Sequence, residues 1–533
     1  MKKLTIALGV ISALVVVLAS GGVAAAEKPQ YGGVLTWFDY ADPARLDIHS
    51  ESPLGVQQAV AGIYSSLLQY NPDDPTKIIP DLAERYEASA DGLTYTFHLR
   101  KGVKWHDGKP FTSADVKTSL DRVLNPKFRS PRCGAMLKPL VAGVEAPDSH
   151  TIQIRLKFPA APFIPSIASA WCRIVPKHVL DKYGDLKKPE AQIGTGPFKF
   201  KKYTRGSVIE WERNPDYFIK GLPYLDGVKQ FVLKGKATML AAAKAGRVML
   251  WDTWPPMSKT VADELKRARG DTIELYRWPI NVLWMVHMNA TKPPFNNKDI
   301  RRAVHLGLDR AALVAKGLEG AGAPCTVLDP KLVGDYALPL EEVQKIPGCR
   351  QDKKADDIAE AKRLVEKHYP GGLDIDVVVR TVGNYVDRVQ LVLAGLRKIG
   401  IRGKLKTYES AAGYGVYGKG AFTMIGTQDT AMVVADPSSA FSILYTTKAG
   451  RNWEKFSDPK IDELAAKGLR ERDHAKRVKI YHELQRYILT QDSGAIPIAW
   501  VEGWFFKDKR VQNYKPANTI YDNSTFMKVW LKK

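Results

Sequence analysis

One stretch of the chain, residues 95–126, predicts a β-strand, a tight turn and a capped α-helix in direct succession. Apolar and polar side chains alternate over residues 95–99, which is the pattern of a half-buried strand. The turn-forming residues WHDGK follow, and Thr112 with Asp115 then has the spacing of a capping box that begins a helix. The helix is expected to end near Asn125, which precedes a proline. This succession favours a mixed α/β fold.

Other segments repeat the mixture of strand and helix patterns. Alternating or continuous apolar runs predict strands, and apolar residues at three- and four-residue spacing predict helices. No repeat of fixed period is present, which excludes solenoids and propellers. The segments are strands at 151–158 and 375–379, and helices at 300–308, 361–365 and 478–488 and from Asp458-Pro459 onward.

The length of 533 residues exceeds a single hydrophobic core, and a hydrophobic fraction of 45% is enough for two or three cores. The formal net charge is +22, from 79 basic and 57 acidic side chains. Lysine and arginine are scattered along the chain, without a basic helix or zinc-finger spacing, so we expect no nucleic-acid partner. The charge indicates either a solvated basic surface or a preference for anionic ligands or an acidic partner surface.

The first 26 residues have the pattern of a signal peptide for Sec export. A basic start is followed by an apolar run over residues 4–19 and by three alanines that end at Ala26. We therefore expect cleavage after Ala26. An uncleaved anchor is the alternative, but the apolar run is short for a membrane span. No cysteine lies near the cleavage site, so the mature protein is expected to be periplasmic, freely soluble and without a lipid anchor.

Two motifs behind this leader carry a resemblance to a known family. Residues 99–115, LRKGVKWHDGKPFTSAD, and residues 194–218, GTGPFKFKKYTRGSVIEWERNPDYF, resemble the extracytoplasmic solute-binding proteins of ABC importers. The resemblance is to family 5, which includes dipeptide-, oligopeptide- and nickel-binding members. Further similar segments begin at Arg213, Pro293 and Phe456, so the resemblance covers nearly the whole mature chain.

The resemblance implies an α/β, bilobal periplasmic-binding-protein clamshell of class II type, with an extra domain in the first lobe and two hinge crossings. The crossings are expected near residues 284–289 and 494–500, and bending there buries the ligand. Carried onto this chain, the hinge-bearing domain of lobe 1 comprises residues 27–57, 193–281 and 495–533, the extra domain comprises residues 58–192, and lobe 2 comprises residues 282–494.

The four cysteines lie in the exported part of the chain, where an oxidising compartment favours disulfides over metal ligation. Four cysteines allow three pairings. Cys133 and Cys172 fall within one implied domain, and so do Cys325 and Cys349. We therefore expect these two disulfides.

Motifs that would indicate an enzyme are incomplete. Residues 413–420, GYGVYGKG, are similar to a phosphate-binding loop, but Gly420 stands where serine or threonine binds magnesium. The sequence HELQR from His482 has Arg486 in place of the second histidine of a zinc protease motif. The ten histidines are dispersed. We expect no enzymatic activity, no cofactor and no metal site.

Peptide-binding members of the family accept the ligand's amino terminus on an aspartate just before a D-P-x-x-F segment, which begins here at Asp436. Counting back without a gap puts Val433 in the amine-binding place, whereas Asp429 takes it only with a four-residue insertion. A buried valine cannot balance an ammonium, so this departure argues against peptides. If Asp429 points into the cleft, a cationic or zwitterionic ligand becomes plausible again.

Aromatic and polar side chains near predicted strand ends complete the expected cleft, since ligands of α/β folds bind there. Arg380 ends a predicted strand. It is expected either to pair with a ligand carboxylate or to form part of a hinge salt bridge. The predicted ligand-binding residues are Tyr40, Trp251, Trp254, Arg380, Tyr385, Gln428, Asp429, Trp453 and Trp500.

The sequence thus predicts a monomeric periplasmic receptor that binds a small organic solute or a short peptide. Its expected partners are ABC permease subunits in the inner membrane, whose cytoplasmic ATPases supply the energy of transport. Two alternatives stay open. One is a sensor protein that presents a ligand to a membrane receptor, and the less favoured one is a secreted hydrolase on the same fold.

Overall fold

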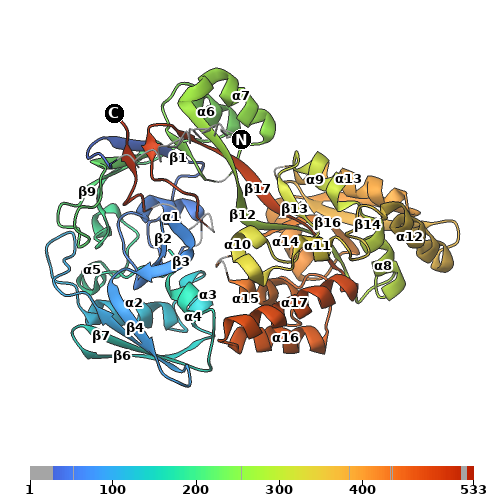
Figure 1. Ribbon diagram of the computed structural model, residues 1–533, viewed down its shortest axis with the longest axis horizontal. Coiled ribbons are helices and arrows are strands. Elements are labelled where there is room, and N and C mark those ends of the chain that lie inside the picture. Colours follow the sequence, from blue (N-terminus) through green and yellow to red (C-terminus); the bar gives the residue numbers. More distant parts are fainter. Residues whose placement is uncertain are drawn as a thin grey trace, which may run out of the picture.

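A computed structural model of the protein describes residues 28–51, 53–253, 255–382, 384–432, 434, 436–517 and 525–533. The predicted signal peptide, residues 1–26, lies outside the described residues. The chain forms two lobes that are joined by a pair of long strands (Figure 1). Among the described residues, no helix is both long and apolar enough to cross a bilayer.

The first lobe contains two four-stranded sheets and a hairpin. One sheet has the order β1 (Val34–Asp39), β10 (Gly227–Val232), β9 (Val208–Arg213) and β8 (Phe198–Thr204), in which β1 and β10 are parallel. The other, antiparallel, sheet has the order β4 (Ala83–Ala88), β5 (Thr94–Leu99), β7 (Thr151–Leu156) and β6 (Val141–Asp148). The hairpin is formed by β2 (Leu68–Asn71) and β3 (Asp74–Pro80).

The helices of the first lobe pack around these sheets. They are α1 (Leu54–Val60), α2 (Ser113–Leu124), α3 (Cys133–Leu137), α4 (Phe163–Ile167), α5 (Lys177–Tyr183), α6 (Lys236–Lys244) and α7 (Lys259–Arg269). The short strands β18 (Val511–Gln512) and β19 (Trp530–Leu531) pair near the C-terminus. The predicted capping box is confirmed, because Thr112 and Asp115 form both of its hydrogen bonds at the start of α2.

The two sequence motifs meet in the first lobe at His106. Its Nδ1 accepts a hydrogen bond from the backbone N–H of Gly194 at 3.2 Å, so Nε2 carries the proton and donates to the carbonyl of Gly196 at 3.0 Å. Burial lowers the pKa of His106 to about 4. The neutral imidazole therefore joins two segments that are about ninety residues apart in the sequence.

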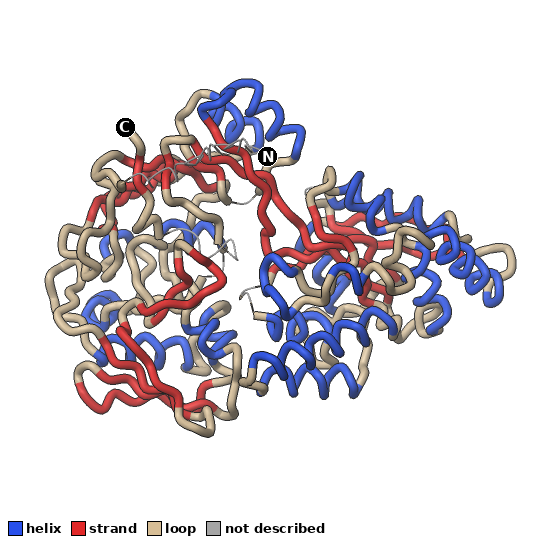
Figure 2. The backbone as a smooth tube through the Cα atoms, in the orientation of Figure 1, coloured by secondary structure: helices blue, strands red, loops and turns tan. Residues whose placement is uncertain are grey.

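Two long strands, β12 (Ile273–Met288) and β17 (Ala495–Asp508), run from one lobe into the other (Figure 2). In the first lobe β17 pairs with β11 (Leu250–Trp251), and in the second lobe β12 pairs with β16 (Met424–Ala431) over residues 282–288. Their own pairing is interrupted between Pro279 and Val282, where Asn281 has a positive φ of 55°.

The second lobe is a sheet with helices on both faces. β14 (Leu373–Arg380) lies between β16 and β15 (Ile401–Tyr408) and is parallel to both, while β13 (Gly322–Pro324) pairs with β17. Separate apolar clusters lie on the two faces. One face carries α8 (Lys298–Gly307), α9 (Arg310–Gly317), α12 (Lys354–His368) and α13 (Tyr385–Arg397); the remaining helices are α10 (Pro330–Val333), α11 (Leu340–Val343), α14 (Ser410–Gly418), α15 (Pro437–Ala440), α16 (Pro459–Arg470) and α17 (His474–Thr490).

Both predicted disulfides are present. Cys133 is bonded to Cys172, with Cα atoms 5.1 Å apart, and Cys325 is bonded to Cys349, with Cα atoms 5.7 Å apart. Both separations are usual for disulfides. The first bond joins α3 to the segment after α4, and the second closes a loop in lobe 2, so each bond stays within one lobe.

Candidate functional site

A cavity of about 430 Å³ lies between the two lobes, beside the long connecting strands. Tyr40 follows β1, Gly235 follows β10, Val382 follows β14, and Asp429 lies near the end of β16. Because β1 and β10 are parallel, and β14 and β16 are parallel, these residues stand at carboxyl ends of parallel strands. That edge of an α/β sheet is where ligands bind. The cavity is therefore the candidate functional site.

The lining is mainly apolar, with charged side chains from both lobes. Such a mixture suits a small organic ligand that is held by shape and oriented by a few polar contacts. The apolar lining includes Met239, Pro255, Pro256, Met257, Ile280, Leu318, Ala321, Val382, Val501 and Trp504, and the charged residues are Lys236, Lys259, Glu319, Arg388, Asp429 and Glu502.

A buried ion pair forms the wall of the cavity in lobe 2. Arg388 in the first turns of α13 donates from Nη1 and Nη2 to the two carboxylate oxygens of Asp429, at 2.8 and 2.9 Å. Both side chains are more than nine-tenths buried. The guanidinium also lies over the rings of Trp284 and Tyr385. Two-point pairing of this kind fixes the orientation of both groups.

Tyr385 connects this pair to Arg380. The backbone N–H of Asp429 donates to the hydroxyl oxygen of Tyr385 at 3.0 Å, and burial raises the pKa of that hydroxyl above its usual value. Arg380 lies 5.5 Å from the centre of the Tyr385 ring and donates to Gln428 Oε1 at 3.2 Å. Tyr40, Tyr385 and Asp429, all predicted from the sequence, thus line the cavity, and Arg380 and Gln428 lie directly behind them.

Three of the four predicted tryptophans lie away from this cavity. Trp251 is buried against Phe38 in a core beside α6 and α7. Trp453 packs with Tyr414 and Tyr417, and Trp500 is buried in a core of lobe 2. These three side chains do not line the interlobe cavity. Trp254, like Val433, lies outside the described residues.

Two further carboxylates of the cavity come from residues that the sequence did not indicate. Glu319, just after α9 in lobe 2, accepts a hydrogen bond from the backbone N–H of Thr260 in the first turn of α7, at 3.1 Å. Glu502 of β17 pairs with Lys331 and Arg277, both at 2.5 Å. Neither residue stands in a recognisable motif. Arg388 could have been predicted from the sequence, because it lies one helical turn after Tyr385, which was itself predicted to bind the ligand.

The acid nearest to this site along β1 is Asp39, which is fully buried. Its Oδ1 accepts from the backbone N–H of Ala41 at 3.0 Å, and its Oδ2 has no hydrogen-bond partner among the described residues. Burial raises the pKa of Asp39 to about 7. The residue that precedes Tyr40 therefore carries a buried carboxyl group that is about half protonated near neutral pH.

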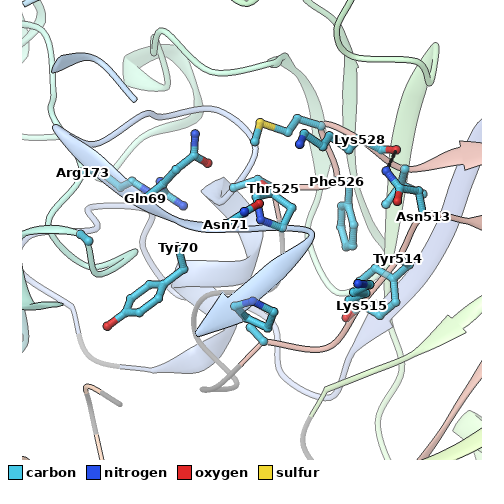
Figure 3. A pocket seen from close by; sticks show the side chains of 16 residues that line it. Gln69, Tyr70, Asn71, Arg173, Asn513, Tyr514, Lys515, Thr525, Phe526 and Lys528 are labelled. Carbon is cyan, nitrogen blue, oxygen red and sulfur yellow. Dashed lines mark hydrogen bonds between the residues drawn. The ribbon is translucent and has the colours of Figure 1, made fainter. Parts of the chain in front are cut away.

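A second pocket lies inside lobe 1, between β2 and the C-terminal segment (Figure 3). Gln69, Asn71 and Arg173 line one side of it, and Asn513, whose amide donates to the carbonyl of Lys528 at 3.1 Å, lines the other. Its volume of about 40 Å³ has room for only about three water molecules. The interlobe cavity, at about 430 Å³, is large enough for a solute.

The described residues contain no group of three or more histidine, cysteine, aspartate or glutamate side chains arranged to hold a metal ion. The cavity offers apolar contact, a fixed ion pair and charged side chains. Two lobes that are joined by a pair of long strands and line one cavity form the architecture of a bilobal ligand-binding protein.

Comparison with known proteins identifies the family. A profile of the bacterial extracellular solute-binding proteins, family 5, matches residues 77–452. The chain belongs to this family, whose members are periplasmic solute-binding proteins of ABC importers.

Two relatives are similar over most of their length. Heme-binding protein A of Haemophilus influenzae is 29% identical and is matched over 86% of this chain and 85% of its own. The dipeptide-binding protein of Escherichia coli is 28% identical, over 79% and 81% of the two chains. Their names show that different ligands occur among similar sequences.

Solved structures agree with the fold. The periplasmic protein AgaA of A. tumefaciens R10, in complex with agropinic acid, is 28% identical with a TM-score of 0.72, and the match covers 94% of this chain and 99% of that one. The protein DppA of Helicobacter pylori, in complex with the peptide STSA, is 26% identical with a TM-score of 0.74, over 95% and 99%. The predicted bilobal α/β clamshell is confirmed.

Proposed function

We propose that this protein is the periplasmic receptor of an ABC importer, which binds a small organic solute or a short peptide between its lobes and delivers it to permease subunits in the inner membrane. The observation that carries the proposal is the interlobe cavity of about 430 Å³, lined by residues of both lobes and of the strands that join them. A ligand in that position contacts both lobes at once.

Such contacts give the ligand a higher affinity for the closed state than for the open one, which is what drives closure. We place the bend at the interruption between Pro279 and Val282, opposite Glu502 and Val501. This is a few residues before the predicted crossing at 284–289, because residues 282–288 are held in the lobe 2 sheet by β16. The other domain boundaries, including the extra domain at residues 58–192, stay predictions.

The proposal includes export with cleavage after Ala26 and action as a monomer. The receptor itself performs no chemistry, since the energy of transport comes from ATPases that drive the permease. In this proposal the predicted residues Tyr40, Tyr385 and Asp429 contact the solute directly. Arg380 and Gln428 lie behind them and hold their side chains in place.

The test is to denature freshly purified mature protein, identify the released small molecule by mass spectrometry, and measure its rebinding by calorimetry. We expect one compound that rebinds at one molecule per chain and whose uptake is lost when the gene is deleted. Conversion of the compound by the protein, or unchanged uptake in the deletion strain, contradicts the proposal.

A further inference from the structure

The second lobe also touches the first one at the connection between α16 and α17. Figure 1 shows α16 beside the first lobe at the bottom of the molecule, whereas β12 and β17 pass between the lobes higher up. Ala161, just before α4, donates its N–H to the carbonyl of Leu469 in the last turn of α16, at 3.0 Å. Arg472, two residues after α16, donates from Nη1 to the carbonyl of Ala90 at 3.2 Å. Two hydrogen bonds therefore link the lobes at a point away from the connecting strands.

The bond to Leu469 satisfies a carbonyl at the end of a helix. The last carbonyls of an α-helix have no partner within the helix, and the negative end of the helix dipole favours a donor there. The carbonyl of Lys467 accepts from the N–H of Glu471 at 2.9 Å, which closes α16. The carbonyl of Leu469 accepts from Ala161, which belongs to the other lobe. Separation of the lobes leaves this carbonyl to water.

The guanidinium of Arg472 lies on the turn between β4 and β5. A Cβ atom at Gly92 would come within 2.6 Å of Arg472 Nη1, so the arginine packs directly on this glycine. Ser89 Oγ donates to Asp91 Oδ1 at 2.5 Å and stiffens the turn. Hydrogen bonds from Ser89 and Leu93, together with the charge of Arg472, lower the pKa of Asp91. The Asp91 carboxylate is therefore charged at neutral pH and attracts Arg472.

Arg470 adds a third contact, because its guanidinium lies 5.5 Å from the centre of the Phe158 ring. The connection that carries these arginines is held firmly in lobe 2. Asp473 caps α17 by accepting from the backbone N–H of Lys476 at 2.9 Å, and both α16 and α17 pack into one apolar core. The contact thus joins two segments that are each fixed within their own lobe.

We infer that the connection between α16 and α17 is a latch for the closed state: residues 469–472 hold the first lobe at residues 90–92 and 158–161 when the lobes are closed and release it when they open. Rotation about a bend in β12 and β17 separates a contact that lies away from those strands. The inference rests on the proposed function, since closure there encloses the solute.

The latch residues are not among those that line the interlobe cavity. The latch therefore stabilises the closed state before any solute binds, and it changes the affinity by the same factor whatever the chemistry of the solute.

The experiment uses the mature protein freed of solute and measures two quantities. One is the hydrogen-exchange rate of the Ala161 amide, whose bond to Leu469 protects it while the latch is closed. The other is the open-to-closed ratio, from distances between spin labels on the two lobes. We expect Arg472→Gln to raise both about two- to fivefold, since an exposed charged contact is lost. Arg470→Gln/Arg472→Gln is expected to raise both about tenfold.

Two controls separate the latch from a general loss of structure. The amide of Ser166 donates to the carbonyl of Pro162 within lobe 1 at 2.9 Å, so its exchange rate is expected to stay the same in every variant. Arg397→Gln changes an exposed arginine at the end of α13 and is expected to leave both measured quantities unchanged.

Unchanged exchange at Ala161 in both latch variants overturns the inference. Faster exchange there with unchanged spin-label distances overturns it too, because the contact then opens locally while the lobes stay in place. An equal rise at Ser166 also overturns it, since the variant then loosens lobe 1 itself. None of these measurements uses a solute, so each of these failures leaves the receptor function standing, and that function is tested separately by release and rebinding of the solute.

Discussion

At the scale of single residues, the pair of Arg388 and Asp429 has the largest expected effect. Arg388→Met leaves the Asp429 carboxylate buried without a partner, so we expect the free energy of unfolding to fall by about 3–5 kcal/mol in urea denaturation. The double variant Arg388→Met/Asp429→Leu is expected to recover most of this loss, because it removes the uncompensated charge as well.

The matched control is Arg402→Met, which breaks a two-point arginine–aspartate pair with Asp374 on the exposed surface. Its expected loss is below about 1 kcal/mol. Equal losses for the buried and the exposed pair contradict the structural role given to Arg388.

A second residue-scale prediction concerns pH. Burial raises the pKa of Asp39 from 3.8 to about 7. Between pH 3.8 and about pH 7, the folded state therefore holds a proton that the unfolded state has lost. Its contribution to stability is complete below pH 4 and is lost as the pH rises through 7. When the pH is raised from 5 to 8, the melting temperature of Asp39→Asn is therefore expected to fall less than that of the unchanged protein. Asp121→Asn, at an exposed position on α2, is the control, and an unaltered pH profile in Asp39→Asn refutes the prediction.

At the scale of elements, the contact between Glu319 and α7 joins the two lobes beside the cavity. An anionic group at a helix N-terminus contributes about 0.3–1 kcal/mol. Glu319→Ala is therefore expected to raise the open-to-closed ratio of the ligand-free protein about two- to fivefold, as measured by distances between spin labels on the two lobes. Glu341→Ala, exposed on α11, is the control. An unchanged distance distribution in Glu319→Ala shows that the contact does not bias closure.

Elements with local signals were predictable from the sequence. The capping box of α2, the start of α16 behind Asp458 and the buried run of β14 all depend on neighbouring residues, and the structure contains each of them. The place where the lobes bend stays a prediction. The end of the pairing between β12 and β16 is not marked by any local pattern, because the two strands lie some 140 residues apart in the sequence.

The site was predictable only where strand ends mark it. Tyr40 and Tyr385 were predicted because ligands bind beyond the carboxyl ends of strands, and both line the candidate cavity. Trp251 and Trp500 were selected on aromatic character, which serves core packing equally well, and both are buried in cores. Glu319 and Glu502 were missed because only the tertiary fold brings them to the cavity.

At the scale of the whole molecule, the lobes also touch on the side away from the cavity. In lobe 1, Ala161 donates its N–H to the carbonyl of Leu469 at 3.0 Å, and the carbonyl of Ala90 accepts from Arg472 at 3.2 Å. Arg470 lies over the ring of Phe158. This contact, the long strands and the hydrogen bond from Thr260 to Glu319 each constrain the relative motion of the lobes.

We propose that one solute molecule binds between the lobes and closes them. The test is small-angle X-ray scattering on the emptied protein, titrated with the solute released from it. We expect a radius of gyration that falls as solute is added and reaches its final value at one molecule per chain. A solute that binds stoichiometrically while the scattering curve stays the same contradicts it.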